Sequence, residues 1–306
     1  LIETLDLGNT EILDMTVSSD GYFYTTGVKY ADNTYTGTVK KWSPSGQLLL
    51  SWNLMSGTYE QAIAKLAITN DNRLVVATQS KISIFSEQGL LLKEIKGYIR
   101  PNFPDQIKPF SFITHLAINE NNELLVLDTH NKLISINLEG KLLRPIVINN
   151  INNIGKSLSS NLAYDNQGFI YDNQVSVGTD SFSACHCIRQ FDSSGKLVKT
   201  WGGLGSKRGQ FSYPVAFRLD KNNNLYIADS GNSRIQKLSQ DGSSVWSTGD
   251  QLGQLELTKD IAVDSSKNIY VLDAGHYRIQ KFAANGTFLK SWGSLGLKRG
   301  QFSYLQ

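Results

Sequence analysis

Short apolar runs alternate with polar turns along the whole chain. The most regular of these turns ends in a glycine and leads into a mostly apolar run. It occurs six times, at intervals of 43 to 55 residues, with the glycine at Gly46, Gly89, Gly140, Gly195, Gly242 and Gly286. A tight hairpin turn takes at least one residue through positive φ, which glycine tolerates best. The pattern therefore predicts six repeated units that share one hairpin and one outer strand.

Each unit has three further apolar runs ahead of its glycine turn. In the fifth unit these runs are 214–219, 225–228 and 234–238. No segment shows a sustained period of 3.6 residues, so helices are not expected. A period of roughly 40 to 50 residues with four strands per unit is typical of a propeller. We predict an all-β fold, a six-bladed β-propeller of four-stranded antiparallel blades.

One domain is expected over residues 1–306. Its blades are predicted at approximately 11–55, 62–98, 112–149, 157–204, 213–250 and 257–293. The sequence WGGLGSKRGQFSY from Trp201 returns as WGSLGLKRGQFSY from Trp292. Residues 294–306 are therefore expected to begin a further repeat or to close the ring, and Leu1 to Leu7 to pair beside the last blade if the two ends overlap.

The last two units carry the most specific motif. DSGNSRIQK from Asp229 and DAGHYRIQK from Asp273 resemble the Asp-x-x-Asn-x-Arg-Ile pattern of the NHL repeat, with His276 in place of the asparagine. The third unit keeps Asp128 and Asn131 but departs afterwards, and the first, second and fourth units depart further. The resemblance implies a six-bladed NHL-type propeller that binds its ligands on the top face. This face holds the loops between blades and those between second and third strands.

Composition narrows the function only slightly. The 306 residues are 40% hydrophobic and 19% charged, with a net charge of +3 that does not demand a nucleic-acid or anionic-membrane partner. No apolar run approaches the ~18 residues needed to span a bilayer, so membrane insertion is not expected. Two cysteines are too few to hold the fold together by disulfides. A secreted or cell-envelope location is favoured, with the cytoplasm as the alternative; the oligomeric state stays open.

One residue of each unit is expected at the mouth of the central channel, just before the inner strand. These residues form the channel-mouth ring: Asp14, Lys65, His115, Asn161, Ala216 and Asp260. One interpretation is a solvated mouth in which Lys65 pairs with Asp14. The other is a site for a cation or a small polar ligand. Carboxylate and amide oxygens suit calcium and His115 suits zinc, although Lys65 argues against either.

All four histidines are expected on the top face, with His130, His186 and His276 in loops between second and third strands. Metal-dependent lyases of a related six-bladed fold use histidines around the channel mouth. Such a metal could activate water or polarise a carbonyl. A metal-dependent lyase or hydrolase is thus one alternative function, with His115, Asp14 and Asp260 as candidate ligands. No HExxH motif supports it, and no cofactor is expected otherwise.

Cys185 and Cys187 flank His186, and an extended segment would place both thiols on one side. Two soft ligands could then face one metal. Without a second cysteine pair, we favour two small apolar side chains on a half-buried strand.

Binding of single-stranded RNA on the top face is the second alternative. The repeated loops offer Lys207-Arg208 and Lys298-Arg299, with Phe211, Tyr213, Tyr30 and Tyr35 as aromatic residues of the kind that stack bases. The copied loops are also explained as repeat structure, with Phe211 and Tyr213 packed between blades.

The function favoured by the sequence is non-enzymatic recognition of a protein segment or a glycan on the top face. Loops of variable length on a rigid scaffold carry such functions. The first unit has an insertion around Tyr30, Asp32, Asn33 and Tyr35, and the fourth has one around Asp180, Phe182 and His186. These insertions are the leading contact regions, alongside His130 and His276, and the alternative is that both are tolerated surface loops.

Overall fold

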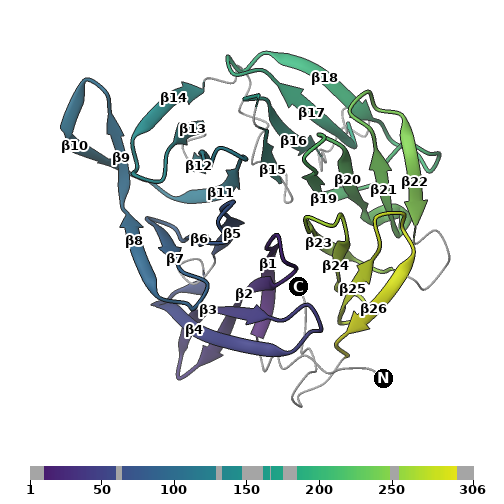
Figure 1. The fold of residues 1–306 in the computed structure, drawn as a ribbon, viewed down its shortest axis with the longest axis horizontal. Helices are drawn as coiled ribbons and strands as arrows, with labels where there is room; N and C mark the ends of the chain where they lie inside the picture. Colours follow the sequence, from purple (N-terminus) through teal and green to yellow (C-terminus); the bar gives the residue numbers. More distant parts are fainter. Residues whose placement is uncertain are drawn as a thin grey trace.

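The computed structural model describes residues 10–59, 64–128, 133–146, 161–165, 167–174, 185–248 and 255–294. Six four-stranded antiparallel sheets are arranged as blades around a central axis, with the first strand of each blade innermost (Figure 1). This arrangement confirms the predicted six-bladed, all-β propeller. The expected pairing of Leu1 to Leu7 and nearly all of segment 294–306 lie outside the described residues.

The first three blades are each built from consecutive strands. The first blade has β1 (Thr10–Val17), β2 (Phe23–Ala31), β3 (Thr34–Trp42) and β4 (Leu48–Gly57). The second has β5 (Lys65–Ile68), β6 (Leu74–Ala77), β7 (Ile82–Phe85) and β8 (Leu91–Ile95). The third has β11 (Ile113–Ile118), β12 (Leu124–Asp128), β13 (Leu133–Ile136) and β14 (Leu142–Ile146).

The other three blades repeat this plan. The fourth has β15 (Leu162–Tyr164), β16 (Ile170–Gln174), β17 (Cys187–Phe191) and β18 (Leu197–Gly202). The fifth has β19 (Pro214–Leu219), β20 (Leu225–Asp229), β21 (Arg234–Leu238) and β22 (Ser244–Thr248), with the 3-10 helix η2 (Ser230–Asn232) after β20. The sixth has β23 (Thr258–Val263), β24 (Ile269–Asp273), β25 (Arg278–Phe282) and β26 (Phe288–Trp292).

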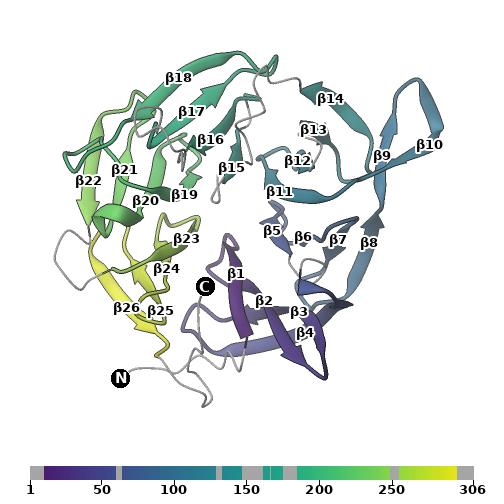
Figure 2. The ribbon, with the colours of Figure 1, turned by 180° about the vertical axis from the view of Figure 1, so that it is seen from behind.

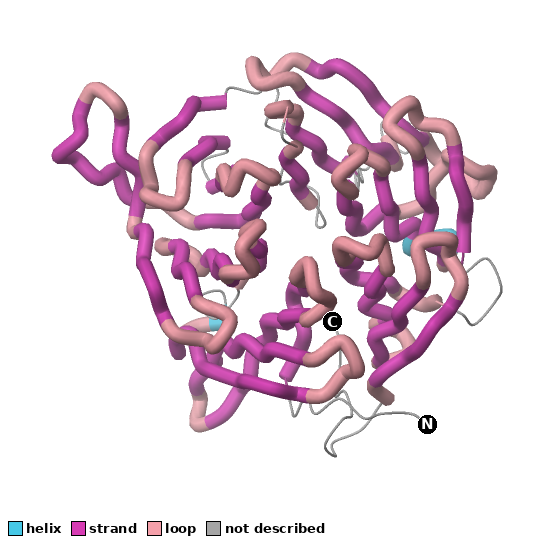
Figure 3. Tube along the Cα trace, in the orientation of Figure 1, coloured by secondary structure: helices cyan, strands magenta, loops and turns pink. Residues whose placement is uncertain are grey.

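The six predicted glycines lie in the turns between third and fourth strands, which Figure 3 draws as short loops at the rim. Their φ angles lie between 79° and 92°, the region expected from the sequence. At Gly46 a side chain is also excluded by space, since an added Cβ would lie 2.2 Å from the ring of Trp292 in the sixth blade. The repeated glycine therefore shapes the turn and, at Gly46, also admits the tryptophan of a neighbouring blade.

The hydrophobic core lies between blades as well as within them. At the seam between the sixth and first blades, Trp292 is fully buried and its rings pack on Phe23 and Tyr270. The indole Nε1 of Trp292 donates to the carbonyl oxygen of Ser45 at 2.6 Å. In the described part of the chain, each of these two blades consists of its own four consecutive strands, and neither takes a strand from the other. Side-chain packing and hydrogen bonds thus hold this seam.

Two features of the fold differ from a plain repeat. The first-blade insertion extends the β2–β3 hairpin instead of forming an irregular loop, with Tyr30 paired opposite Tyr35. An additional hairpin, β9 (Gly97–Arg100) and β10 (Phe103–Pro109), projects from the rim between the second and third blades (Figures 1 and 2). The sequence did not predict this hairpin, because β10 contains two prolines and all its residues are exposed.

Candidate functional site: the channel mouth and the top face

A bulge at the start of the inner strand sets the direction of most channel-mouth ring residues. In the first, third, fifth and sixth blades the pairing with the second strand shifts just before Asp14, His115, Ala216 and Asp260. A bulge re-aims the side chain that follows it. Asp14, Lys65, His115 and Asn161 line the cavity in the channel, so the register of the repeats brought these four together as expected.

Asp14 and Asp260 join blades through backbone N–H groups. The Asp14 carboxylate accepts from Met15 at 3.1 Å and from Leu66 of the second blade at 2.7 Å. Asp260 accepts from Ile261 at 2.8 Å and, across the seam, from Met15 at 3.0 Å. Among the described residues, Lys65 and Asp14 do not form the expected ion pair, and Asp14 contacts backbone amides instead. Both acids are buried, and they hold adjacent inner strands in register.

The channel contains a charged side chain that sequence reasoning missed. Arg218 of β19 donates from Nη2 to Asp260 at 2.9 Å and from Nη1 to Asn161 at 3.0 Å. Its register position is occupied in the other blades by small residues: Thr16, Ala67, Ala117, Ala163 and Ala262. An alignment of the six units could have revealed Arg218, because the other five units have a small residue at this position. Arg218 thus joins the fourth, fifth and sixth blades.

Burial raises the pKa of Asp260, and the nearby Asp14 carboxylate raises it further, while the Arg218 guanidinium opposes the shift. A carboxyl whose pKa is higher in the folded than in the unfolded state favours folding at low pH. Its contribution is lost as pH rises through the folded-state pKa.

We expect Asp260→Asn to reduce the pH dependence of stability. Between about pH 4, the ordinary aspartate range, and neutral pH, the Tm of the wild type should fall relative to that of the variant. The asparagine cannot ionise, and its amide can donate to Asp14. Thermal denaturation at pH steps from 4 to 8 measures this difference. Parallel Tm curves for the two proteins would contradict the prediction.

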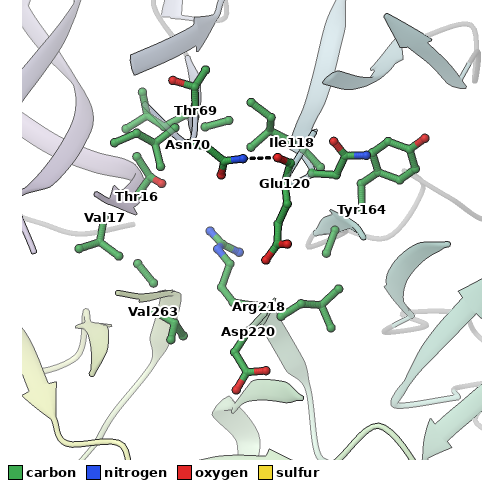
Figure 4. A pocket seen from close by; sticks show the side chains of 18 of the residues that line it. Thr16, Val17, Thr69, Asn70, Ile118, Glu120, Tyr164, Arg218, Asp220 and Val263 are labelled. Carbon is green, nitrogen blue, oxygen red and sulfur yellow. Dashed lines mark hydrogen bonds between the residues drawn. The ribbon is translucent and has the colours of Figure 1, made fainter. Parts of the chain in front are cut away.

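The channel encloses a cavity of about 590 Å³. The inner strands of all six blades supply its walls, and Arg218 extends from the fifth blade toward its middle (Figure 4). The channel-mouth ring lies at one end. Residues of the turns between first and second strands, including Glu120 and Lys221, lie at the other.

The proposed metal ligands already have hydrogen-bond partners within the protein. Each oxygen of Asp14 and Asp260 accepts a hydrogen bond, and the Arg218 cation lies against Asp260. The Nδ1 atom of His115 lies 3.0 Å from the Thr114 hydroxyl. Within the described ranges, no group of three or more His, Cys, Asp or Glu residues could hold a metal ion. The donor set is organised for blade-to-blade contact.

The described histidines outside the ring have internal partners. His186 is buried, and its Nδ1 accepts from the Tyr213 N–H at 2.9 Å, which ties the fourth blade to the fifth. Burial lowers its pKa, although Asp229 opposes the shift. The Nδ1 of His276 lies 3.1 Å from Asp273, and its Nε2 lies 3.7 Å from Glu256. His130, Asp180 and Phe182 lie outside the described residues.

The NHL-like motif builds a loop around a buried carboxylate. Asp229 is fully buried and accepts from Asn232, Arg234 and Gln236 at 2.8–3.0 Å. It also accepts from the Ser212 N–H at 2.6 Å, so it fixes the preceding loop. In the sixth blade Asp273 holds Arg278 and Gln280 in the same way, with His276 in the asparagine place. The motif therefore has a structural role in both blades.

Cys185 and Cys187 form a disulfide. The prediction that the two cysteines act as small apolar side chains on a half-buried strand is therefore wrong. It spans only His186, whose φ of 42° lies in the left-handed region. The disulfide therefore constrains one turn next to the fourth blade and does not connect distant elements.

The repeated glycine-rich loop offers little stacking surface. Phe211 is fully buried, consistent with the interpretation that it packs between blades. Tyr213 is about half exposed, but one side of its ring meets His186. Lys207 and Arg208 are exposed, and the Lys207 carbonyl oxygen accepts from Arg234. Lys298 and Arg299 lie outside the described residues.

Three tyrosines gather on the extended hairpin of the first blade. The Tyr30 and Tyr35 rings lie 4.7 Å apart, and the Tyr35 ring meets Tyr59 edge-on at 5.4 Å. Tyr30 is 57% exposed. Asp32 and Asn33 form the turn with φ of 50° and 58°, and Asn33 accepts from the Tyr30 hydroxyl at 3.1 Å. We call Tyr30, Tyr35 and Tyr59 the tyrosine cluster.

Residues 211–238 match the NHL repeat family, which agrees with the motif at Asp229. None of the curated proteins matches the sequence. A catalytically inactive virginiamycin B lyase from Staphylococcus aureus, solved with quinupristin, is similar at 15% identity and a TM-score of 0.58, covering 97% of this chain and 88% of that one.

Two further solved structures are similar. A streptogramin B lyase has 13% identity and a TM-score of 0.59, with 97% of this chain and 88% of that one covered. A protein of unknown function from Bacteroides thetaiotaomicron VPI-5482 has 14% identity and a TM-score of 0.61, with 92% and 72% covered. At these identities the likeness shows the fold alone. No helix in the described ranges is long and apolar enough to cross a membrane.

Proposed function

Because this chain is a six-bladed β-propeller that carries an NHL repeat, we propose that it is a non-enzymatic recognition module. Its ligand is a protein segment or a glycan, bound on the top face. The observation that carries this proposal is the tyrosine cluster, which the first blade presents on its extended β2–β3 hairpin.

The cluster has the physical properties of a binding anchor. Tyrosine offers a large contact area with few rotatable bonds, so that little side-chain entropy is lost on binding. Tyr30 and Tyr35 face each other across paired strands, and Tyr59 supports Tyr35 from the end of the outer strand. Such rigid aromatic residues dominate the binding energy of many interfaces.

Polar groups beside the rings supply hydrogen bonds. Asp32 and Asn33 are exposed at the hairpin turn next to Tyr30. An aromatic centre with a polar rim is the usual anatomy of a recognition surface. Both ligand classes fit this arrangement, since each offers apolar faces together with hydrogen-bonding groups.

The two alternative functions have less support. A metal-dependent lyase or hydrolase requires open ligand positions, whereas Asp14 and Asp260 are engaged with amides and Arg218. For RNA, Phe211 is buried and Tyr213 meets His186, so base stacking would depend mainly on Tyr30 and Tyr35. The Cys185–Cys187 disulfide supports a secreted or cell-envelope location, because such bonds persist in oxidising compartments.

We expect the double variant Tyr30→Ala/Tyr35→Ala to lose at least about tenfold in affinity, because truncating interface anchors costs more than about 1 kcal/mol each. A displayed peptide library and a glycan array, probed with both proteins, select the ligand class. Titration of the best ligand then measures the loss. Phe103→Ala is the control, since Phe103 is an exposed aromatic of the β9–β10 hairpin at 47% exposure.

Two results would overturn the proposal. One is that the wild-type protein binds nothing on either array, or that its ligands bind the double variant equally well. The other is stoichiometric zinc or calcium in the purified protein that is lost on replacing His115, which would favour the enzyme alternative.

A further inference from the structure

We propose that the mouth half of the central channel binds a small anion, a carboxylate or a phosphate, between Arg218 and Lys65. This site is separate from the tyrosine cluster and does not rest on the recognition function proposed above. It lies in the cavity of about 590 Å³ that all six inner strands enclose.

Arg218 has hydrogen-bonding capacity left for a ligand. A guanidinium has five N–H donors. Three are used, by Asn161, Asp260 and the carbonyl oxygen of Phe217. Nε and one hydrogen of Nη2 have no partner in the described structure. Nε and Nη2 share one edge of the guanidinium, and an edge with both donors available holds a carboxylate or phosphate with two parallel hydrogen bonds.

The same contacts fix the orientation of this edge. Asn161 and Asp260 belong to the blades on either side of Arg218, so its side chain is held across the channel from both flanks. The Arg218 side chain remains 24% exposed, and Figure 4 shows it pointing into the middle of the cavity. A donor held in place before the ligand arrives loses little entropy on binding.

Lys65 belongs to the inner strand on the opposite side of the channel from Arg218. The inner strands contact one another in the order β1, β5, β11, β15, β19, β23, which places β5 and β19 three blades apart. Lys65 starts β5 and lines the same cavity, and its ammonium makes no ion pair or hydrogen bond with the described residues. An anion on the channel axis would therefore meet one cation from each side.

The acidic side chains that line the cavity already have partners or belong to its turn end. Asp165, Asp220 and Asp264 lie at the turn end, where their partners are Tyr171, Lys267 and Tyr270. Asp14 and Asp260 are more than 90% buried, and their oxygens already accept hydrogen bonds from the backbone and Arg218. Glu120 is exposed and belongs to a turn at the far end of the cavity, and Figure 4 shows its side chain extending from there toward the middle. Its charge repels an anion from that end and favours the mouth half, where Lys65 and Arg218 lie.

The cavity size restricts the ligand to a small molecule. Pockets of roughly 300–1,000 Å³ suit small molecules. The ring of inner strands excludes a folded partner from the channel. The ligand class is thus a compact carboxylate or phosphate compound.

The test is isothermal titration of the wild-type chain with succinate and with inorganic phosphate, and with neutral succinamide as the matched control ligand. We expect saturable binding of at least one anion and none of succinamide. Succinate and phosphate distinguish the two anion classes. Lys65→Met should weaken binding about tenfold, as the loss of one cation contact of about 1.4 kcal/mol implies.

A second variant tests the guanidinium edge. Arg218→Lys keeps a cation beside Asp260 but removes the two-nitrogen edge, and we expect a loss of about tenfold or more. Lys221→Met, at the turn end of the cavity, should leave binding unchanged. The proposal is overturned if neither anion binds, or if both Lys65→Met and folded Arg218→Lys bind as tightly as the wild type. Either result leaves the outcome of the peptide and glycan arrays unaffected.

Discussion

Asp229→Ala is expected to lower the free energy of unfolding by about 3–5 kcal/mol, the range seen when one partner of a buried ion pair is removed. Asp229 is fully buried and its carboxylate lies 2.8 Å from Nε of Arg234, which is itself only 7% exposed. The substitution leaves this guanidinium without its counter-charge and releases the Ser212 amide. Urea denaturation of the two proteins measures the difference.

A double variant separates the ion pair from other effects of the substitution. Arg234→Met removes the cation that Asp229→Ala leaves unpaired. The double variant Asp229→Ala/Arg234→Met should therefore lose less unfolding free energy than the two single variants together, by at least about 1 kcal/mol. Asp273→Ala, at the same position of the sixth blade, should be as damaging as Asp229→Ala. Additive single changes, or a loss below about 1 kcal/mol for Asp229→Ala, would contradict this account.

Trp292→Ala should cost about 3–5 kcal/mol of stability, as expected for a large buried aromatic side chain. Trp292 is fully buried at the seam where the sixth blade meets the first, stacks on Tyr270 and donates to Ser45. Side-chain packing holds the described strands of these two blades together at the seam. Loss of the Trp292 side chain should therefore loosen both blades. Denaturation measures the stability, and amide hydrogen exchange locates the loosened strands.

Trp201→Ala is the matched control for location. Trp201 stacks on Tyr171 in the fourth blade and covers Gly242 of the fifth, as Trp292 covers Gly46. Faster exchange is expected in the first and sixth blades for Trp292→Ala, and in the fourth and fifth blades for Trp201→Ala. If both variants speed exchange in the same blades, the seam does not depend on its own tryptophan.

The sequence predicted the blades because their signals are local. A glycine at positive φ and alternating apolar runs depend on neighbours in the chain, so Gly46 and its five equivalents marked the hairpins correctly. The β9–β10 hairpin was missed, because its exposed strand with Pro104 and Pro109 lacks the apolar alternation of a core strand. The first-blade insertion was located, but its regular pairing was not.

The candidate site was less predictable, because its contacts join distant parts of the chain. Repeat register placed Asp14 and Lys65 at the channel correctly, yet it could not show that Asp14 accepts from Leu66. The only sign of Arg218 in the sequence is that the other five units have a small residue at the equivalent position. His186 was expected in an open loop, whereas its contact with the Tyr213 amide buries it.

Each described blade consists of four consecutive strands, and this contiguity has a genetic consequence. One uninterrupted stretch of coding sequence specifies a complete blade together with its hairpin glycine. A single duplication or exchange event can therefore transfer an intact structural unit, and a blade can diverge without changing the strands of its neighbours. The first blade illustrates this independence, since its extended hairpin carries Tyr30 and Tyr35 while its four strands keep the common blade order.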